Sequence, residues 1–152
     1  MGSTYQSIVV PAPASAVWQT LRDFHDLSWA PGVIESCEAV GDHAGTQPGA
    51  QRILNDAFHE TLHAVNDVDR ILKYSIDDGP SPVSKDEVSN YVGRIEVRPV
   101  THDGTDAPGS ATFVEWSSGW DAKTDEAEEF CQTIYVSLLR ALREHFSGEA
   151  TA

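Results

Sequence analysis

The sequence predicts an α+β fold, in which a seven-stranded antiparallel sheet grips one long C-terminal helix. Residues 124–146 repeat apolar side chains at spacings of three and four, which is typical of a helix with one wide apolar face. Six short strand-like segments precede this helix and are joined by turns, so neighbouring strands should run antiparallel. A helix of roughly 33 Å needs a broad surface against which to bury its apolar face. The sheet is the part of the chain that can supply that surface.

The chain should begin with one strand, at residues 4–10. Pro13 suits the first position of a following helix, because proline lacks the N–H that a helix leaves unbonded there. One face of this helix carries Val17, Trp18, Leu21 and Phe24. Residues 25–32 should form a second short helix or an irregular turn. The fold prediction therefore places two short helices between the first and second strands.

The remaining strands are recognised by β-branched and aromatic residues that alternate with polar ones between clusters of turn residues. The clearest case has Leu72, Tyr74 and Ile76 on one face and Lys73 and Ser75 on the other. The expected strands cover residues 33–40, 51–55, 58–65, 70–76, 88–97 and 111–120.

Composition limits the function classes. The 152 residues suffice for one domain, 1–152, with a substantial core, and 40% of them are hydrophobic. The net charge is −14, from 24 acidic and 10 basic residues, which argues against a nucleic-acid partner and an anionic membrane surface. No apolar run approaches the ~20 residues of a membrane span, and no signal peptide is visible. We expect a cytoplasmic protein without membrane insertion, and its oligomeric state stays open.

One motif, residues 59–63, matches the H-E-x-x-H pattern of zinc metalloproteases. That pattern needs a helix, on which residues four apart share one face. This segment instead precedes a turn and an alternating strand, as in a hairpin. Residues four apart on a strand are separated by about 13 Å, too far for His59 and His63 to share a zinc ion. We therefore expect no metal site, and no nucleotide-binding motif or other sign of a cofactor is present.

Glu60 should then share the inner face of its strand with Leu62. A carboxylate on an apolar wall has a raised pKa unless it is paired, and could act as an acid or a base. Arg52 on the neighbouring strand is the expected partner. An ion pair of purely structural value is the alternative. Tyr74 and Tyr91 also have inward parity, so the candidate catalytic residues are Glu60, Tyr74 and Tyr91.

A sheet curled around one helix should leave a cavity that the helix cannot fill, and such spaces bind small molecules. Strand alternation and the i, i+4, i+8 stripe of the helix select its lining. Gly93 lacks a side chain, which should leave room where a ligand or the helix approaches. The predicted ligand-binding residues are Leu54, Glu60, Leu62, Tyr74, Tyr91, Gly93, Ile95, Trp116, Ser118, Phe130, Ile134 and Leu138.

The order of these elements, together with several local strings, resembles the START-like, helix-grip (SRPBCC) superfamily. The resemblance extends over about residues 5–146 and is strongest to its bacterial polyketide cyclase/dehydrase-type group. It is carried by Val10-Pro11-Ala12-Pro13, Val17-Trp18, Asp23-Phe24, Trp29, Asn66-Asp67, Tyr74-Ser75-Ile76, Asn90-Tyr91 and the closing amphipathic helix.

The plant abscisic-acid receptors are a more distant match. Their gate loop is replaced here by the short segment 55–58, and their latch has no counterpart in residues 82–87. Hormone signalling is therefore not implied.

The resemblance implies a protein that binds a small hydrophobic ligand, such as a lipid-like, polyketide or aromatic molecule. The alternative is a cyclase or dehydratase in which Glu60 and a tyrosine transfer protons. The fold hosts both classes, so it does not choose between them. A third possibility is an accessory protein that binds a partner through its acidic surface.

Overall fold

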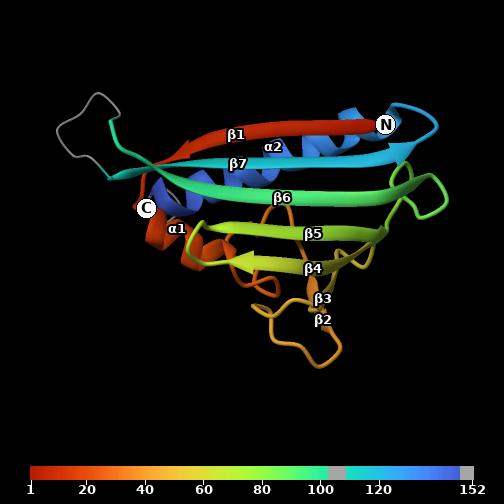
Figure 1. Ribbon diagram of the computed structural model, residues 1–152, viewed down its shortest axis with the longest axis horizontal. Helices are drawn as coiled ribbons and strands as arrows, with labels where there is room; N and C mark the ends of the chain where they lie inside the picture. Colours follow the sequence, from red (N-terminus) through yellow and green to blue (C-terminus); the bar gives the residue numbers. More distant parts are fainter. Residues whose placement is uncertain (103–108, 148–152) are drawn as a thin grey trace.

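The computed structural model describes residues 1–102 and 109–147. Its seven strands form one sheet in the order β1-β7-β6-β5-β4-β3-β2, and every neighbouring pair is antiparallel (Figure 1). The strands are β1 Gly2–Val10, β2 Cys37–Val40, β3 Gln51–Leu54, β4 Phe58–Asn66, β5 Ile71–Asp78, β6 Val88–Val100 and β7 Ala111–Ala122. The helices are α1 Ala14–Leu21 and α2 Glu126–Ser147.

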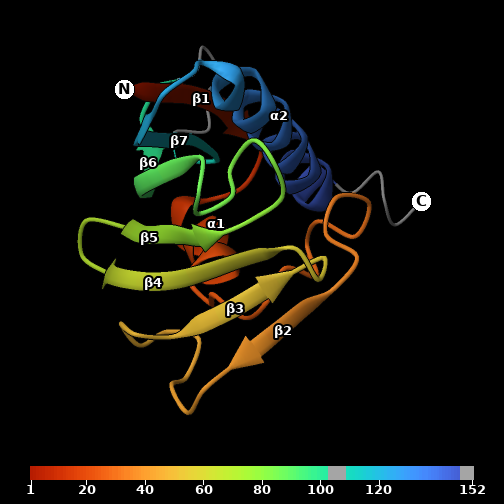
Figure 2. The same cartoon turned by 90° about the vertical axis from the view of Figure 1, so that its right-hand side faces the viewer.

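The chain starts at one edge of the sheet with β1 and crosses to the opposite edge through α1. From there β2 to β7 return strand by strand until β7 lies beside β1. Figure 1 shows α2 running along one face of the sheet, behind β1 and β7. Figure 2 shows the other strands curving away from β1, so that α1 and α2 lie on the same concave side. The predicted seven-stranded antiparallel sheet and C-terminal helix are confirmed.

The prediction of a second short helix between β1 and β2 is wrong, because residues 25–32 form turns. Two aspartates explain this result. Asp23 Oδ1 accepts the backbone N–H of His25 at 2.9 Å, and Asp26 Oδ1 accepts that of Ser28 at 3.0 Å. Side chains that bond to nearby backbone groups in this way compete with helical hydrogen bonds. The segment therefore stops at isolated turns, such as that from Leu27 O to Ala30 N.

The long helix α2 agrees with its sequence pattern. Glu126, Glu128 and Glu129 occupy its first turn and His145 its last, as the helix dipole favours. The buried stripe consists of Ala127, Cys131, Tyr135, Leu138, Leu139 and Leu142. Among the described residues, no helix combines the length and the apolar character that crossing a membrane requires.

The β3–β4 turn shapes one rim of the concave face. Asn55 and Asp56 both have positive φ, 53° and 54°, as the two central residues of a type I′ turn require, and Ala57 N donates to Leu54 O at 2.9 Å to close that turn. The Asn55 side chain also ties down the segment before β2. Its Oδ1 accepts the N–H groups of Glu35 and Ser36 at 2.7 and 3.2 Å, and its Nδ2 donates to Val33 O at 3.1 Å. This anchoring explains why β2 begins at Cys37, four residues later than predicted.

We expect Asn55→Ala to lower the free energy of unfolding by about 1–2 kcal/mol more than Asp56→Ala, measured by urea denaturation. Both substitutions place alanine at a positive φ, so they share that backbone cost. Only Asn55 also loses side-chain hydrogen bonds to residues 33–36. Equal losses in the two variants would contradict the anchoring role.

Candidate ligand-binding cavity

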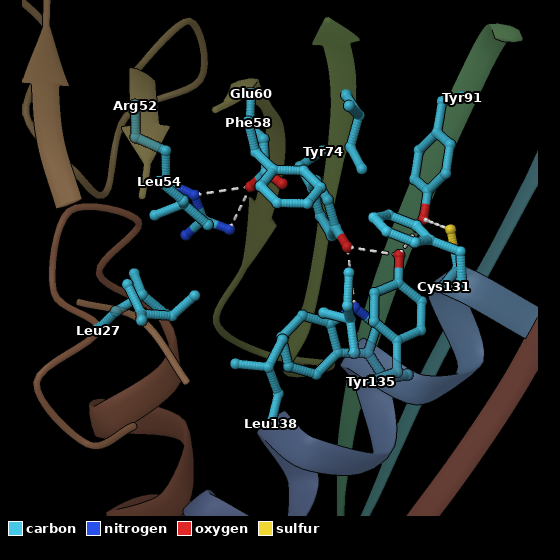
Figure 3. A pocket seen from close by; sticks show the side chains of 15 residues that line it. Leu27, Arg52, Leu54, Phe58, Glu60, Tyr74, Tyr91, Cys131, Tyr135 and Leu138 are labelled. Atoms are coloured by element: carbon cyan, nitrogen blue, oxygen red, sulfur yellow. Dashed lines mark hydrogen bonds and ion pairs between the residues drawn. The ribbon is translucent and has the colours of Figure 1, made fainter. Parts of the chain in front are cut away.

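A cavity of about 40 Å³ lies between the concave face of the sheet and residues 130–138 of α2 (Figure 3). Eight of the twelve residues predicted from the sequence line it, and these come from five strands and the helix. They are Leu54, Glu60, Tyr74, Tyr91, Trp116, Phe130, Ile134 and Leu138.

The other four predicted residues lie elsewhere. Leu62 is fully buried in the core. Ile95 borders a separate void of about 10 Å³, which also contacts Leu72. Ser118 lies behind the wall, where its Oγ accepts the hydroxyl hydrogen of Tyr91 at 3.0 Å. These residues have the inward orientation that alternation predicts, but other side chains separate them from the cavity.

The prediction that Gly93 leaves room for a ligand or the helix is wrong, because Tyr74 already occupies the space beside this glycine. A Cβ placed at Gly93 would lie 2.2 Å from Cζ of the Tyr74 ring. The two residues face each other across β5 and β6. The missing side chain therefore makes room for a tyrosine ring and not for a ligand or the helix.

Three tyrosine hydroxyls meet at one end of the cavity, as Figure 3 shows. Tyr135 Oη on α2 lies 2.8 Å from Tyr74 Oη on β5, and it also hydrogen-bonds to Tyr91 Oη on β6. Trp116 Nε1 on β7 donates to Tyr74 Oη at 2.9 Å. The hydroxyls thus satisfy one another in a buried place where an unbonded polar group would be costly.

Burial raises the pKa of Tyr74, Tyr91 and Tyr135 well above 10, because a phenolate would be poorly solvated in this place. The charges of neighbouring groups act in the same direction, among them that of Glu60 on Tyr74. These tyrosines are therefore neutral at physiological pH and can donate or accept hydrogen bonds.

The other polar end of the cavity is an ion pair between Arg52 and Glu60, the partners expected from the sequence. Arg52 Nε and Nη2 both donate to Glu60 Oε1, at 2.8 and 2.6 Å, and Nη1 donates to Phe24 O at 2.9 Å. The guanidinium also lies over the Phe24 ring, 3.7 Å from its centroid. Burial raises the pKa of Glu60, and the nearby guanidinium opposes that rise.

The sequence prediction missed seven lining residues, among them the cysteine and the tyrosine on α2. The helical spacing held a signal for these two, since Cys131 and Tyr135 lie four apart and so share a face. Leu27 and Ile34 come from the irregular segment before β2, where no period applies. The full set is Leu27, Ile34, Arg52, Phe58, Ile76, Cys131 and Tyr135.

The H-E-x-x-H segment lies in β4, so the predicted strand is confirmed. His59 and His63 are exposed on the outer face, while Glu60 is buried on the inner one. His63 Nε2 is bonded to Ser75 Oγ at 2.8 Å. Within residues 1–102 and 109–147, no three His, Cys, Asp or Glu side chains gather as a metal site would require.

A family model described as "Polyketide cyclase / dehydrase and lipid transport" matches residues 1–147. The chain belongs to this family. Membership of this family implies a hydrophobic ligand-binding fold. None of the curated proteins matches the chain.

Solved structures agree with the family assignment. A protein from Nitrosospira multiformis is 46% identical over 99% of both chains, with a TM-score of 0.90. XoxI from Bacillus cereus is 28% identical over 96% of both chains, with a TM-score of 0.74. A protein from Thermobifida fusca is 26% identical over 96% of this chain and 93% of the Thermobifida chain, with a TM-score of 0.76.

We expect Gly93→Ala to lower the free energy of unfolding by about 1–3 kcal/mol, because the added methyl group overlaps the Tyr74 ring. Gly119→Ala on β7 is the matched control, since its Cβ would meet its nearest atom, Gly2 O, at an ordinary 3.8 Å. Urea denaturation of both variants measures the difference. A Gly93→Ala variant as stable as wild type would show that the ring can move aside freely.

The tyrosine cluster also predicts a loss of stability at alkaline pH. Tyrosine in an unfolded chain ionises near pH 10, whereas Tyr74, Tyr91 and Tyr135 keep their protons to higher pH in the native state. Above about pH 10 the native state therefore binds more protons than the unfolded state, and the free energy of unfolding falls as pH rises. The stabilising contribution is fully present below that pH.

We expect phenolate absorbance from these three tyrosines to rise together with the loss of the circular dichroism signal. The measurement is repeated in Tyr5→Phe, because Tyr5 is exposed and is the one tyrosine of four outside the cluster. In that variant the phenolate absorbance comes from the three buried tyrosines alone. Ionisation of the three buried tyrosines while the protein remains folded would contradict the prediction.

Proposed function

We propose that the protein binds a small hydrophobic molecule in the cavity between the sheet and α2. The observation that carries this proposal is the lining. Aromatic and aliphatic side chains form most of the wall, and polar groups occur only at the Arg52–Glu60 pair and at the tyrosine cluster. Binding sites for small molecules typically combine an apolar wall with a few placed polar groups. The family to which the chain belongs supports the same conclusion.

The size of the cavity favours a compact ligand over a long-chain lipid. Its volume of about 40 Å³ corresponds to only a few water molecules, at roughly 10–15 Å³ each on this measure. A ligand as large as one ring must therefore displace part of the wall. Phe58 and Phe130 are suited to this movement, since both are half-buried and their rings stack on each other at 6.2 Å. We place the entry for the ligand between them.

An enzymatic function is a second candidate, favoured by one observation. Glu60 and the hydroxyl of Tyr74 line the same cavity, so a bound molecule could meet a carboxylate and a neutral phenol together. That pairing could move a proton on a cyclising or dehydrating substrate. An enzyme would lose turnover but keep binding in Glu60→Gln, whereas a carrier has no turnover to lose.

Filling the cavity should weaken binding. We expect Ile134→Phe to weaken the binding of an apolar fluorescent probe at least about tenfold, because the larger side chain on α2 takes up the space. Gln132→Phe is the matched control on the exposed side of the same helix. Titration of both variants, with native mass spectrometry of the purified wild-type protein for a retained molecule, tests the proposal. Equal probe affinity in both variants would place the binding site elsewhere.

A further inference from the structure

We infer that the cavity selects a neutral, flat hydroxyl compound of the phenol class, whose O–H group donates a hydrogen bond to Glu60. This inference rests on the proposed binding function and adds the chemistry of the ligand. It follows from counting which hydrogen-bond donors and acceptors at the cavity are already in use.

The tyrosine cluster uses its own donors. An indole N–H can only donate, so Tyr74 Oη must accept from Trp116 Nε1. At the far end Tyr91 donates to Ser118 Oγ. The chain of hydrogen bonds therefore runs from Tyr74 through Tyr135 to Tyr91, and each hydroxyl hydrogen is taken by the next oxygen. What these hydroxyls can still offer a ligand is oxygen lone pairs.

The ion pair can offer a ligand both a charged acceptor and N–H donors, which a hydroxyl group can meet together because it both donates and accepts. Three of the five N–H groups of Arg52 donate to Glu60 Oε1 and Phe24 O, and one hydrogen on each of Nη1 and Nη2 has no acceptor among the described residues. Both guanidinium contacts to the carboxylate fall on Oε1. Among the described residues no donor reaches Glu60 Oε2, and Figure 3 shows this oxygen turned away from Arg52. Oε2 is thus a charged acceptor without a partner on the cavity wall.

Charge favours a neutral ligand over an acid. Arg52 and Glu60 are the two formal charges among the lining residues, and they cancel. A bound carboxylate would add a second negative charge beside Glu60 in an apolar space, where Coulomb repulsion is poorly screened. A neutral O–H brings no such cost and satisfies Oε2 in a charge-assisted hydrogen bond, which is stronger than a neutral one.

The shape of the wall supports a flat ring. Trp116 and Tyr135 stack at 5.1 Å, and Phe58 and Phe130 stack at 6.2 Å. Aromatic faces of this kind pack well against another ring. A phenol combines the flat apolar body that these faces accept with the single donor that Glu60 lacks.

Two isomers test the inference. p-Cresol and anisole have the same atoms, but only p-cresol can donate a hydrogen bond. Isothermal titration calorimetry at neutral pH should give wild-type protein an affinity for p-cresol about tenfold higher than for anisole, from one hydrogen bond to a charged acceptor. Benzoate, an anion of similar size, should bind more weakly than p-cresol.

In Glu60→Gln the preference for p-cresol should fall to less than about threefold, because the charged acceptor is gone. Phe130→Ala is the control. It removes apolar contact from both isomers, so both affinities should fall while their ratio stays. Circular dichroism checks that each variant folds, and the wild-type ratio decides the question without any variant.

Each outcome has one meaning. Anisole or benzoate binding as tightly as p-cresol would overturn the inference and leave the proposed binding function standing. Failure of p-cresol to bind while the apolar probe binds would also overturn the inference alone. Failure of all three probes and of the apolar probe would overturn the proposed binding function as well.

Discussion

The hydroxyl of Tyr135 joins the middle of the long helix to two strands of the sheet through buried hydrogen bonds. Tyr135 lies in the middle of the buried stripe of α2, and its Oη meets hydroxyls from β5 and β6. A buried hydroxyl must be bonded, and α2 carries this one among apolar neighbours. The requirement sets the rotation of α2 relative to the sheet. It therefore also sets which side chains of the helix, such as Ile134 and Leu138, reach the cavity.

The ion pair of Arg52 and Glu60 imposes a second constraint, at the opposite end of the cavity. The two residues are directly paired across β3 and β4, and both are nearly buried. Burying such a pair contributes little net stability, whereas removing one partner typically costs about 3–5 kcal/mol, because it leaves an uncompensated charge. The pair therefore contributes little to the stability of the fold, which is consistent with the ligand contact proposed for Glu60. Because Arg52 Nε and Nη2 both donate to Glu60 Oε1, Glu60 Oε2 remains available to accept another hydrogen bond.

Between these two polar ends the wall of the cavity is formed by aromatic and aliphatic side chains. The sheet provides side chains at alternate positions, and the helix provides a stripe at every third or fourth position. A curved sheet and a straight helix meet closely only along part of their length. The space that remains is narrow here, because Tyr74, Trp116 and Tyr135 project into it.

Most of the fold could be predicted from the sequence, since local periodicity decides it. Alternation placed Glu60 and Tyr74 on the inner face, and the spacing of apolar residues identified α2. Residues 25–32 were mistaken for a helix because hydrogen bonds from Asp23 and Asp26 to the backbone leave no periodic signal.

The lining of the cavity was predicted only in part. The sequence pattern of one strand or helix shows which of its side chains are buried, but a cavity depends on how several such elements pack together. Alternation indicates that Gly93 and Tyr74 both lie on the inner face of the sheet. It does not indicate that the Tyr74 ring fills the space beside Gly93. Nor does it bring Leu27 and Ile34 to the cavity, since their positions depend on how the segment before β2 is anchored by Asn55. The sequence by itself determined the elements and their buried faces through short-range periodicity. Only the tertiary structure decided which of those buried side chains touch one another, because close packing depends on distances between residues far apart in the chain.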